Sequence, residues 1–355
     1  MVVDHCKSLK MIPTLSAPEA IEAMNRYGRQ RVPFLFIIDF LAKQPVVLPL
    51  ADVPSEALLF DFNGATNCSP QSAAVAESFL FKKMPISLEE YLPKFNLVVQ
   101  HLKRGDSFLT NLSIPTPIEL SLDLKSVFYN SNAKYRLWWE GHFVCFSPEI
   151  FVQVNNNNRI ASFPMKGTID ANLPDATQRI LNDKKEAAEH ATIVDLIRND
   201  LSMIAQKVWV ERYRYLDKLE TNQKSLLQVS SEIAGIMPPN WQDTLGTWLF
   251  RLLPAGSISG APKPSTLDII QRAEGYERGY YTGVAGVFDG KNLDSGVLIR
   301  YIEQAEKQFV FKSGGGITAR SQVQIEYQEM IDKIYLPIPN AAIYRNTSPI
   351  QRAVV

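Results

Sequence analysis

Predicted strands and helices occur in separate blocks along this 355-residue sequence, and this order restricts the fold more than any other feature. Apolar runs short enough for strands are grouped near the start, the middle and the end: residues 34–38, 58–60, 137–139, 143–146, 151–154, 160–161, 284–288, 297–302 and 308–312. A doubly wound parallel sheet would need strict alternation of strands with helices. The blocks instead predict an α+β fold, with the four middle runs forming one antiparallel meander.

Amphipathic helices are predicted around these blocks. Apolar residues recur every three or four positions in residues 87–104, 183–205 and 323–334, and a shorter helix is expected at 264–273. Gly105 is expected to end the first of these helices, since glycine commonly follows the last helical residue. The tail after Leu336 contains three prolines and is expected to be peripheral.

Charge and cysteine content argue against several classes of protein. The 37 basic and 37 acidic side chains cancel, so the basic surface that nucleic acid requires is not expected. No apolar run reaches the roughly 20 residues needed to cross a bilayer, and the N-terminus lacks the pattern of a signal peptide. Three scattered cysteines, Cys6, Cys68 and Cys145, suit a reducing compartment. We therefore expect a cytoplasmic protein with a small or locally recognised partner.

Lys166 follows a predicted strand, in the stretch Pro-Met-Lys-Gly-Thr at 164–168. A lysine in such a place is most often a solvated surface charge. To act as a nucleophile it needs a neutral amine, yet an unperturbed lysine is protonated at neutral pH. Catalysis would therefore require burial or a neighbouring cation to lower the pKa of the Lys166 amine.

Three glutamates on two predicted helices are candidate metal ligands. Glu189 lies off the apolar stripe of its helix, so ion pairs on a solvated face are the alternative. Glu326 and Glu329 share one helical face, where their charges repel unless a cation compensates them. Lys333, four residues beyond Glu329, could be that cation. A Mg²⁺ ion could equally serve, because it prefers carboxylates, water and anionic substrates.

Two glycine-rich segments could approach a ligand closely. One spans residues 254–263 and enters a predicted helix, where backbone N–H groups bind anions well. The other holds Gly314, Gly315 and Gly316 after a predicted strand, and a tight bend would explain it equally well. Arg278, Tyr281 and Arg300 lie between the two segments and are suited to holding a carboxylate. Together with the glutamates, these features suggest a small polyanionic substrate bridged to Mg²⁺.

In their order and their residues, these segments resemble the chorismate-utilising enzyme family over about residues 105–333. Five blocks carry the resemblance: Pro-Met-Lys-Gly-Thr at 164–168, Glu-His-x-x-Ile-Val-Asp-Leu-x-Arg-Asn-Asp at 189–200, Pro-x-Gly-Ser-x-Ser-Gly-Ala-Pro-Lys at 254–263, Arg-Gly-x-Tyr-x-Gly at 278–283, and Gly-Gly-Gly-Ile with Glu-Tyr-x-Glu at 314–317 and 326–329. The resemblance implies two antiparallel sheets packed with helices. It also implies one domain over 1–355, with a shortened N-terminal part at 1–104, a main part at 105–336 and a tail at 337–355.

The resemblance also implies chorismate as substrate and Mg²⁺ as cofactor. Glu189 and Glu329 would be the principal metal ligands, with Glu326 nearby, and the metal would hold the ring carboxylate. Glu149, in Ser147-Pro148-Glu149, would be the general acid that helps the 4-hydroxyl leave. Other residues would hold the enolpyruvyl carboxylate or line the substrate: Tyr281, Arg300, Gly314, Gly315 and Gly316 in the first role, and Thr168, Ser259, Lys263 and Lys333 in the second.

Lys166 distinguishes the branches of this family. Anthranilate and isochorismate synthases carry alanine at this place, whereas the aminodeoxychorismate branch carries lysine. The implied reaction is attack of the Lys166 amine on C2 with loss of the 4-hydroxyl, then attack of ammonia at C4 with release of the lysine. No cysteine here has the Gly-x-Cys-x-Gly setting of a glutaminase. A separate glutamine amidotransferase subunit (component II) is therefore the implied partner, and the product would feed 4-aminobenzoate and folate synthesis.

Two positions depart from the family pattern. Leu109 stands where relatives often have glutamine, or lysine in the isochorismate branch, which disfavours activation of water at C2. Gln228 stands where many relatives have histidine. The alternative functions are those of anthranilate synthase component I or an isochorismate or salicylate synthase. A non-catalytic chorismate-binding subunit is an alternative from another class.

Overall fold

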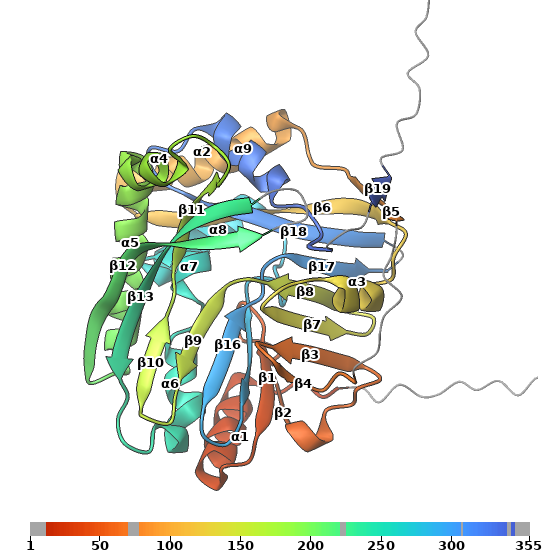
Figure 1. Ribbon diagram of the computed structural model, residues 1–355, viewed down its shortest axis with the longest axis vertical. Helices are drawn as coiled ribbons and strands as arrows, with labels where there is room; N and C mark the ends of the chain where they lie inside the picture. The colour runs from red at the N-terminus through yellow and green to blue at the C-terminus, as the bar shows by residue number, and fades with distance from the viewer. Residues whose placement is uncertain (1–11, 70–77, 221–224, 307, 339–341, 345–355) are drawn as a thin grey trace, which may run out of the picture.

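Two large sheets and the helices that cover them form the frame of the protein (Figure 1). The structure, a computed structural model, describes residues 12–69, 78–220, 225–306, 308–338 and 342–344. Every strand pair is antiparallel except β19 with β5. The predicted α+β class with two antiparallel sheets is confirmed.

The first sheet has nine strands among the described residues, in the order β11-β13-β10-β9-β16-β15-β1-β2, with β12 paired to β13. β12 and β13 form a long hairpin at the left of Figure 1. The bounds are β1 Phe34–Ile38, β2 Val46–Pro49, β9 Ile150–Val154, β10 Arg159–Ser162, β11 Met165–Asp170, β12 Lys207–Glu220, β13 Ser225–Ile236, β15 Val284–Phe288 and β16 Leu293–Val297.

The second sheet has ten strands in the same described ranges, in the order β19-β5-β6-β18-β17-β8-β7-β3-β4, with β14 paired to β6. β6 and β18 are its long central pair. The bounds are β3 Leu58–Phe62, β4 Ala65–Thr66, β5 Ser78–Lys83, β6 Leu109–Leu120, β7 Tyr135–Trp139, β8 Phe143–Ser147, β14 Gly260–Ala261, β17 Tyr301–Ala305, β18 Gln308–Ile317 and β19 Ala342–Tyr344.

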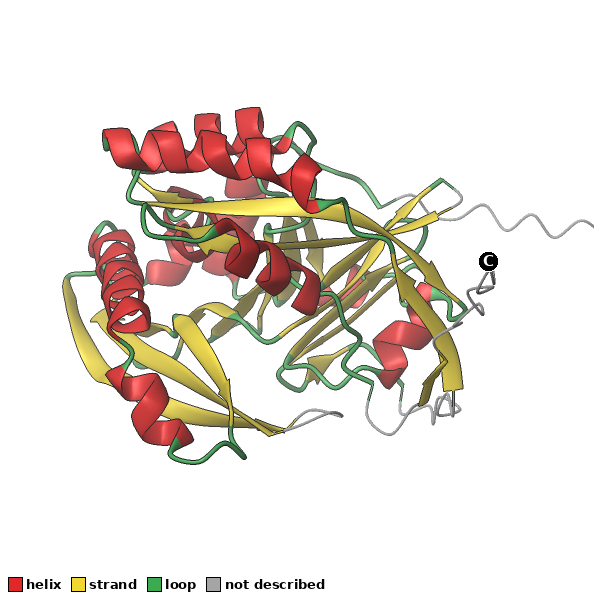
Figure 2. Ribbon diagram, turned by 90° about the horizontal axis from the view of Figure 1, so that it is seen from above, coloured by secondary structure: helices red, strands yellow, loops and turns green. Residues whose placement is uncertain are grey.

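Helices cover one outer face of each sheet (Figure 2). α2, α8 and α9 pack on β6 and β18, and α5 packs on β11, β12 and β13. The bounds are α1 Ala17–Gln30, α2 Leu88–Arg104, α3 Leu124–Asn130, α4 Ala176–Asn182, α5 Lys184–Ser202, α6 Leu245–Arg251, α7 Gly256–Ser259, α8 Lys263–Glu274 and α9 Val323–Asp332, with short 3₁₀ turns at Leu50–Asp52 and Trp241–Thr244. No helix within the described ranges has both the length and the apolar character needed to cross a membrane.

The four predicted helices are confirmed, and their ends show why. Ser87 caps α2 by accepting a hydrogen bond from the Glu90 N–H at 3.3 Å, while the Glu90 carboxylate accepts one from the Ser87 N–H at 2.8 Å. Gly105, with φ of 85°, ends this helix as predicted. Asp183 caps α5 in a similar way through the Glu186 N–H at 2.9 Å.

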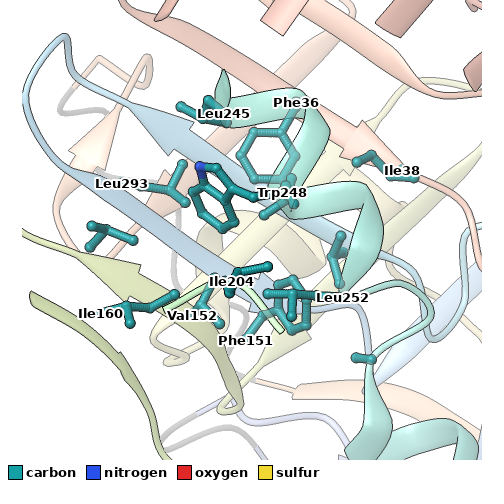
Figure 3. Packing of buried hydrophobic residues seen from close by; sticks show 14 of the residues in the cluster. Phe36, Ile38, Phe151, Val152, Ile160, Ile204, Leu245, Trp248, Leu252 and Leu293 are labelled. Carbon is teal, nitrogen blue, oxygen red and sulfur yellow. The ribbon is translucent and has the colours of Figure 1, made fainter. Parts of the chain in front are cut away.

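A core between the two sheets joins them. In β1, Phe34, Phe36 and Ile38 face a core under α1, α5 and α6, while Leu35 and Ile37 face the core between the sheets. Successive strand residues point to opposite faces, so a strand buried on both sides is apolar throughout. Figure 3 shows the core under the first sheet, with Phe36 beside Trp248.

The predicted meander is wrong, because the chain changes sheets in its middle. β7 and β8 pair in the second sheet, β9 and β10 pair in the first, and β8 does not pair with β9. The predicted strand at 297–302 is wrong for the same reason. β16 ends at Val297 in the first sheet and β17 begins at Tyr301 in the second.

The glycine-rich segments also differ from their predicted forms. Gly314, Gly315 and Gly316 are not a bend after a strand but lie within β18, paired with Ser113, Leu112 and Asn111 of β6. The other segment folds as the short helix α7, strand β14 and the entry to α8. α1, β6, β12 and β13 were not predicted. β6 contains Pro115 and Pro117, which usually argue against a strand.

The structure reaches only part of the predicted termini. The N-terminal residues on which the signal-peptide expectation rests, and Cys6, lie outside the described residues. Cys68 and Cys145 are free thiols, as expected. Within the tail, β19 pairs in parallel with β5 and so extends the second sheet.

Candidate active site

Glu149 and Arg300 lie at two of the places where the chain crosses between the sheets. Glu149 follows β8, and Arg300 precedes β17. The crossings are held side by side by backbone hydrogen bonds, from the Phe146 N–H to the Arg300 carbonyl and from the Val297 N–H to the Glu149 carbonyl, both at 3.0 Å. Arg300 has a φ of 55°, a left-handed conformation that interrupts the strand. The fold thus places a carboxyl and a guanidinium at one junction.

The surroundings of the Glu149 carboxyl favour its protonated form. Burial raises its pKa, while the Ser257 hydroxyl and the charges of Arg300 and Lys333 oppose this shift. Ser257 donates a hydrogen bond to Oε1 at 2.5 Å. A carboxyl whose pKa is raised can donate a proton closer to neutral pH, as the predicted general acid requires.

Lys166 projects from a bulge in β11. The pairing of β11 with β13 shifts register between Met165 and Thr168, and Gly167 takes a φ of 86° in between. A bulge redirects a side chain that a regular strand would point elsewhere. The Lys166 ammonium lies 2.8 Å from Oε2 of Glu189 on α5.

This ion pair affects the pKa of the Lys166 amine. Burial lowers the pKa of the amine, but the charge of Glu189, its hydrogen bond and the charges of Glu329 and Glu186 together outweigh burial, so the pKa is raised. The lowered pKa that catalysis by Lys166 requires is therefore not seen in this arrangement. Glu189 contributes most to the raised pKa.

Seven side chains form a lysine–glutamate cluster around Lys166: Lys166, Lys185, Lys333, Glu186, Glu189, Glu326 and Glu329. The Lys185 ammonium lies 3.7 Å from Oε1 of Glu189 and 3.6 Å from Oε1 of Glu326. Lys333 pairs with Oε1 of Glu329 at 2.7 Å, which confirms that Lys333 compensates this charge. Glu189 and Glu326 are buried, so a solvated face for Glu189 is excluded.

The glycine strand passes directly beside this cluster. A Cβ on Gly315 would lie 3.5 Å from Oε1 of Glu329 and 3.6 Å from Nζ of Lys333. Lys333 also donates a hydrogen bond to the Gly314 carbonyl at 2.9 Å. A Cβ on Gly314 would meet the Leu112 carbonyl oxygen at 2.4 Å, so this position requires glycine. The absence of side chains here keeps space open beside the charged groups.

The carboxylates suit Mg²⁺ in their chemistry, although they do not converge on one point. Oε1 of Glu189 is buried without a hydrogen-bond donor, and carboxylate oxygens are the ligands that Mg²⁺ prefers. Within the described ranges, no three His, Cys, Asp or Glu side chains are arranged to hold a metal. Lysine ammonium groups lie between the glutamates instead.

Tyr281, Arg300 and Thr168 keep hydrogen-bonding groups that a ligand could use. Burial raises the pKa of the Tyr281 phenol, so it stays a neutral donor, and its neighbours include Arg300 and Glu149. Nε of Arg300 is buried without an acceptor in the described structure, and the guanidinium lies 5.3 Å from the Tyr335 ring centroid. Thr168 is exposed on β11.

Ser259 and Lys263 make hydrogen bonds within the protein. The Ser259 side chain is fully buried and donates to the Ala255 carbonyl at 2.9 Å. The Lys263 ammonium lies 2.9 Å from Oδ2 of Asp200 and donates to the Leu252 carbonyl at 2.8 Å. Substrate contacts by these two residues stay predictions.

Arg278 is not a substrate donor in this arrangement. Its guanidinium is buried and forms hydrogen bonds with both carboxylate oxygens of Glu274, at 2.9 and 2.6 Å. Its remaining N–H groups donate to the Ile258 and Asn111 carbonyls and to Thr282. The earlier suggestion that Arg278 holds a carboxylate ligand is therefore wrong.

Sequence reasoning missed Lys185, Glu186 and Ser257. Lys185 and Glu186 precede Glu189 by four and three residues, which places them on the same helical face. That spacing could have identified both. Burial raises the pKa of Glu186, whose carboxylate packs beside Gly167. Ser257 lies in the glycine-rich segment, but nothing in the sequence pairs it with Glu149.

The two positions that depart from the family pattern also border the site. Leu109 is buried, and its Cδ1 would lie 3.1 Å from a Cβ on Gly316. Gln228 is paired with Thr168 in the sheet register, and its Oε1 is buried without a partner among the described residues. Leu109 is thus an apolar neighbour of the site, and Gln228 carries an acceptor oxygen without a hydrogen-bond partner among the described residues.

The fold and the site together define a class: an α+β protein with a charged, partly buried site between two antiparallel sheets. The chain belongs to the chorismate binding enzyme family, whose sequence pattern matches residues 55–339. This match begins 50 residues before the motifs that suggested the family.

Relatives from several organisms are similar to this chain. An uncharacterised PabA-like protein of Haemophilus influenzae is 49% identical over 321 residues, covering 90% of this chain and 97% of its own length. Aminodeoxychorismate synthase component 1 of Salmonella typhimurium is 32% identical, covering 69% of this chain and 56% of its own length. Anthranilate synthase component 1 of Haloarcula marismortui is 33% identical, covering 69% and 52%. Overall identity therefore does not separate the two reactions.

Solved structures agree with the fold. The menaquinone-specific isochorismate synthase MenF of Escherichia coli aligns with a TM-score of 0.71 at 17% identity, covering 92% of this chain and 83% of its own. At that identity, the likeness extends to the fold alone.

Proposed function

We propose that this protein converts chorismate and ammonia into 4-amino-4-deoxychorismate, as the synthase component of an aminodeoxychorismate synthase. The observation that carries the proposal is Lys166, which lies 2.8 Å from Glu189 inside the lysine–glutamate cluster. Family resemblance puts alanine at this place in the anthranilate and isochorismate branches. Because overall identity does not separate the branches, the residue at 166 is the discriminating feature.

Glu189, Glu326 and Glu329 would hold Mg²⁺ in this proposal. When bound, the ion would supply positive charge that stabilises the substrate carboxylate. Arg300, with its unused Nε, and Tyr281 would hold the second carboxylate. Burial lowers the pKa of the Lys166 amine, and a cation that shares the charge of Glu189 would weaken the interaction that raises it.

Lys166 and Glu149 would perform the covalent steps. The Lys166 amine attacks C2, the bond from C4 to the hydroxyl oxygen breaks, and Glu149 gives the hydroxyl a proton so that water leaves. Ammonia then attacks C4, the bond between C2 and Lys166 breaks, and the proton released by the new amine returns to Glu149. Both residues end in their starting forms.

A separate glutamine amidotransferase subunit would supply the ammonia, since we propose no glutaminase activity for this chain. Free ammonia should then replace the partner in the test tube. We place the protein in the cytoplasm, where the proposed product would enter folate synthesis.

The test is a product assay with chorismate, Mg²⁺ and ammonium chloride at alkaline pH. We expect 4-aminobenzoate after an aminodeoxychorismate lyase is added. Anthranilate as the main product would refute the proposal. Tight binding of chorismate with no turnover would instead identify a non-catalytic subunit.

A further inference from the structure

A narrow cavity of about 20 Å³ lies behind Glu149, on the side of the first sheet. Most of its wall is apolar and includes Phe151, Val152 and Leu252, which Figure 3 shows within the core. A cavity needs roughly 10–15 Å³ to hold one water molecule. This one therefore fits a ligand with a single heavy atom.

The polar groups of the cavity wall are mostly hydrogen-bond acceptors. They belong to Glu149, Ser162, Asp200 and Ser257. Both hydroxyl protons are already used, by Ser257 toward Glu149 at 2.5 Å and by Ser162 toward the Phe151 carbonyl at 2.8 Å. Asp200 accepts from Lys263 at 2.9 Å and has a second carboxylate oxygen. Such a wall favours a ligand that donates more hydrogen bonds than it accepts. Ammonia has three donors and one acceptor, whereas water has two of each.

The cavity also lies at the place where the proposed reaction needs a small molecule. Glu149 forms part of its wall, and the charges of Arg300 and Lys333 in the active site act to lower the pKa of the Glu149 carboxyl. Pro164, another wall residue, precedes Lys166 by two positions. A molecule in the cavity therefore lies against the Glu149 side chain, at the edge of the active site.

We propose that this cavity binds the ammonia that attacks C4, and that Ser162, Asp200 and Ser257 orient it beside Glu149. This inference rests on the proposed function. The ammonia lone pair forms the new bond to C4 while the bond between C2 and Lys166 breaks. The surplus proton of the new amine passes to the Glu149 carboxylate, which gave its own proton to the departing water.

The first test is the substitution Ala255→Val, which adds two methyl groups to a buried residue of the cavity wall. With ammonium chloride as the nitrogen source, we expect the KM for ammonia to rise at least about tenfold. The KM for chorismate should stay unchanged. So should the rate at which chorismate alone forms an adduct on Lys166, because that step needs no ammonia. Ala23→Val is the matched control, since Ala23 lies in the same core on α1 but away from the cavity.

The second test needs no variant. Methylamine has two heavy atoms and should not enter the cavity, so the wild-type protein should aminate chorismate with ammonia but not with methylamine. Equal use of the two amines would overturn the inference.

The outcomes separate this inference from the proposed function. If the wild type forms no aminodeoxychorismate, the proposed function fails and the cavity inference fails with it. If the wild type forms the product but Ala255→Val leaves the KM for ammonia unchanged, only the cavity inference is overturned. If Ala255→Val slows the Lys166 adduct as much as the amination, the cavity has no specific role in binding ammonia.

Discussion

Two groups of buried charges lie on either side of the glycine strand β18, and they differ in how completely they are paired. Behind the strand, Arg278 uses its N–H groups on Glu274 and on neighbouring carbonyls, and Glu274 also accepts two hydrogen bonds from Ser113 at 2.7 and 2.8 Å. In the lysine–glutamate cluster, Lys185 lies 3.6 and 3.7 Å from its two carboxylates. Oε1 of Glu189 accepts no hydrogen bond from the described residues.

The difference in pairing distinguishes buried charges that stabilise the fold from buried charges that act in the site. A buried charge that lacks full pairing costs stability, so it persists where a ligand completes it. The Arg278–Glu274 pair is fully hydrogen-bonded. It also forms hydrogen bonds with Ser113 and Asn111, the β6 residues paired with Gly314 and Gly316. The cluster is incomplete, and it surrounds Lys166. We therefore expect changes in the cluster to affect activity and changes in the Arg278 network to affect folding.

The largest effect is expected from Lys166→Ala. Removal of the nucleophile should lower the rate of aminodeoxychorismate formation by a factor on the order of 10⁴ or more. Stability should fall by no more than the roughly 3–5 kcal/mol that loss of one partner from a buried ion pair costs, because Glu189 is buried but keeps Lys185 beside it. Urea unfolding and the product assay measure the two quantities. Lys184→Ala, an exposed lysine of α5, should change neither.

The second-largest effect is expected on stability, in the network of Arg278 and Glu274. Glu274→Gln removes the negative charge but keeps the shape, which leaves the buried Arg278 guanidinium without a counter-charge. Loss of one partner from a buried ion pair costs about 3–5 kcal/mol of unfolding free energy. Urea unfolding should show this loss. A variant as stable as the wild type would show that the pair is not a structural element.

His190 should make stability depend on pH. Nε2 of His190 lies within hydrogen-bond distance of Ser231 Oγ, at 2.7 Å, and this hydroxyl also accepts from the Arg214 N–H at 2.9 Å. Burial, with the charge of Arg214, lowers the His190 pKa to about 4. The unfolded chain, with its usual pKa near 6.5, therefore binds a proton first as pH falls. Stability is lost between about pH 6.5 and pH 4.

From pH 7 to pH 5 this effect amounts to about 2 kcal/mol. His190→Gln should lose about that much less stability than the wild type over the same range, measured by urea unfolding at both pH values. Equal losses in the two proteins would mean that the His190 pKa is not lowered.

The smallest effect is expected on the exposed face of α8. Asp268 and Arg272 have the same four-residue spacing as Glu274 and Arg278, but their side chains are 64% and 53% exposed. Solvent screens such a pair, so Asp268→Asn should cost no more than about 0.5 kcal/mol. A loss of unfolding free energy as large as that of Glu274→Gln would mean that burial does not explain why the two ion pairs differ in their effect on stability.

Local signals predicted the helices well and the sheet crossings poorly. Ser87 and Gly105 mark the ends of α2 in the sequence, and each acts within one turn. The run at 297–302 is predicted as one strand because Val297, Leu298 and Ile302 are all apolar, and all three are buried in the structure. They are buried in three different cores, however, and only the packed fold shows the change of sheet.

The candidate site could be predicted in its residues but not in its pairing. Family motifs identified Lys166, Glu189, Glu326, Glu329 and Lys333, and the spacing of four residues predicted the pair of Lys333 with Glu329. No spacing could predict that Lys185 would lie between Glu189 and Glu326, which come from different helices. Nor could spacing predict that Glu189 would raise the pKa of Lys166, because that shift depends on how the two elements pack.

Mass spectrometry of the protein after rapid mixing with chorismate and Mg²⁺, without ammonia, tests the central claim most directly. We predict a chorismate-derived adduct on the peptide that contains Lys166, no adduct on Lys166→Ala, and loss of the wild-type adduct when ammonia is added. A wild-type protein that forms aminodeoxychorismate with no adduct on Lys166 at any mixing time would contradict the account.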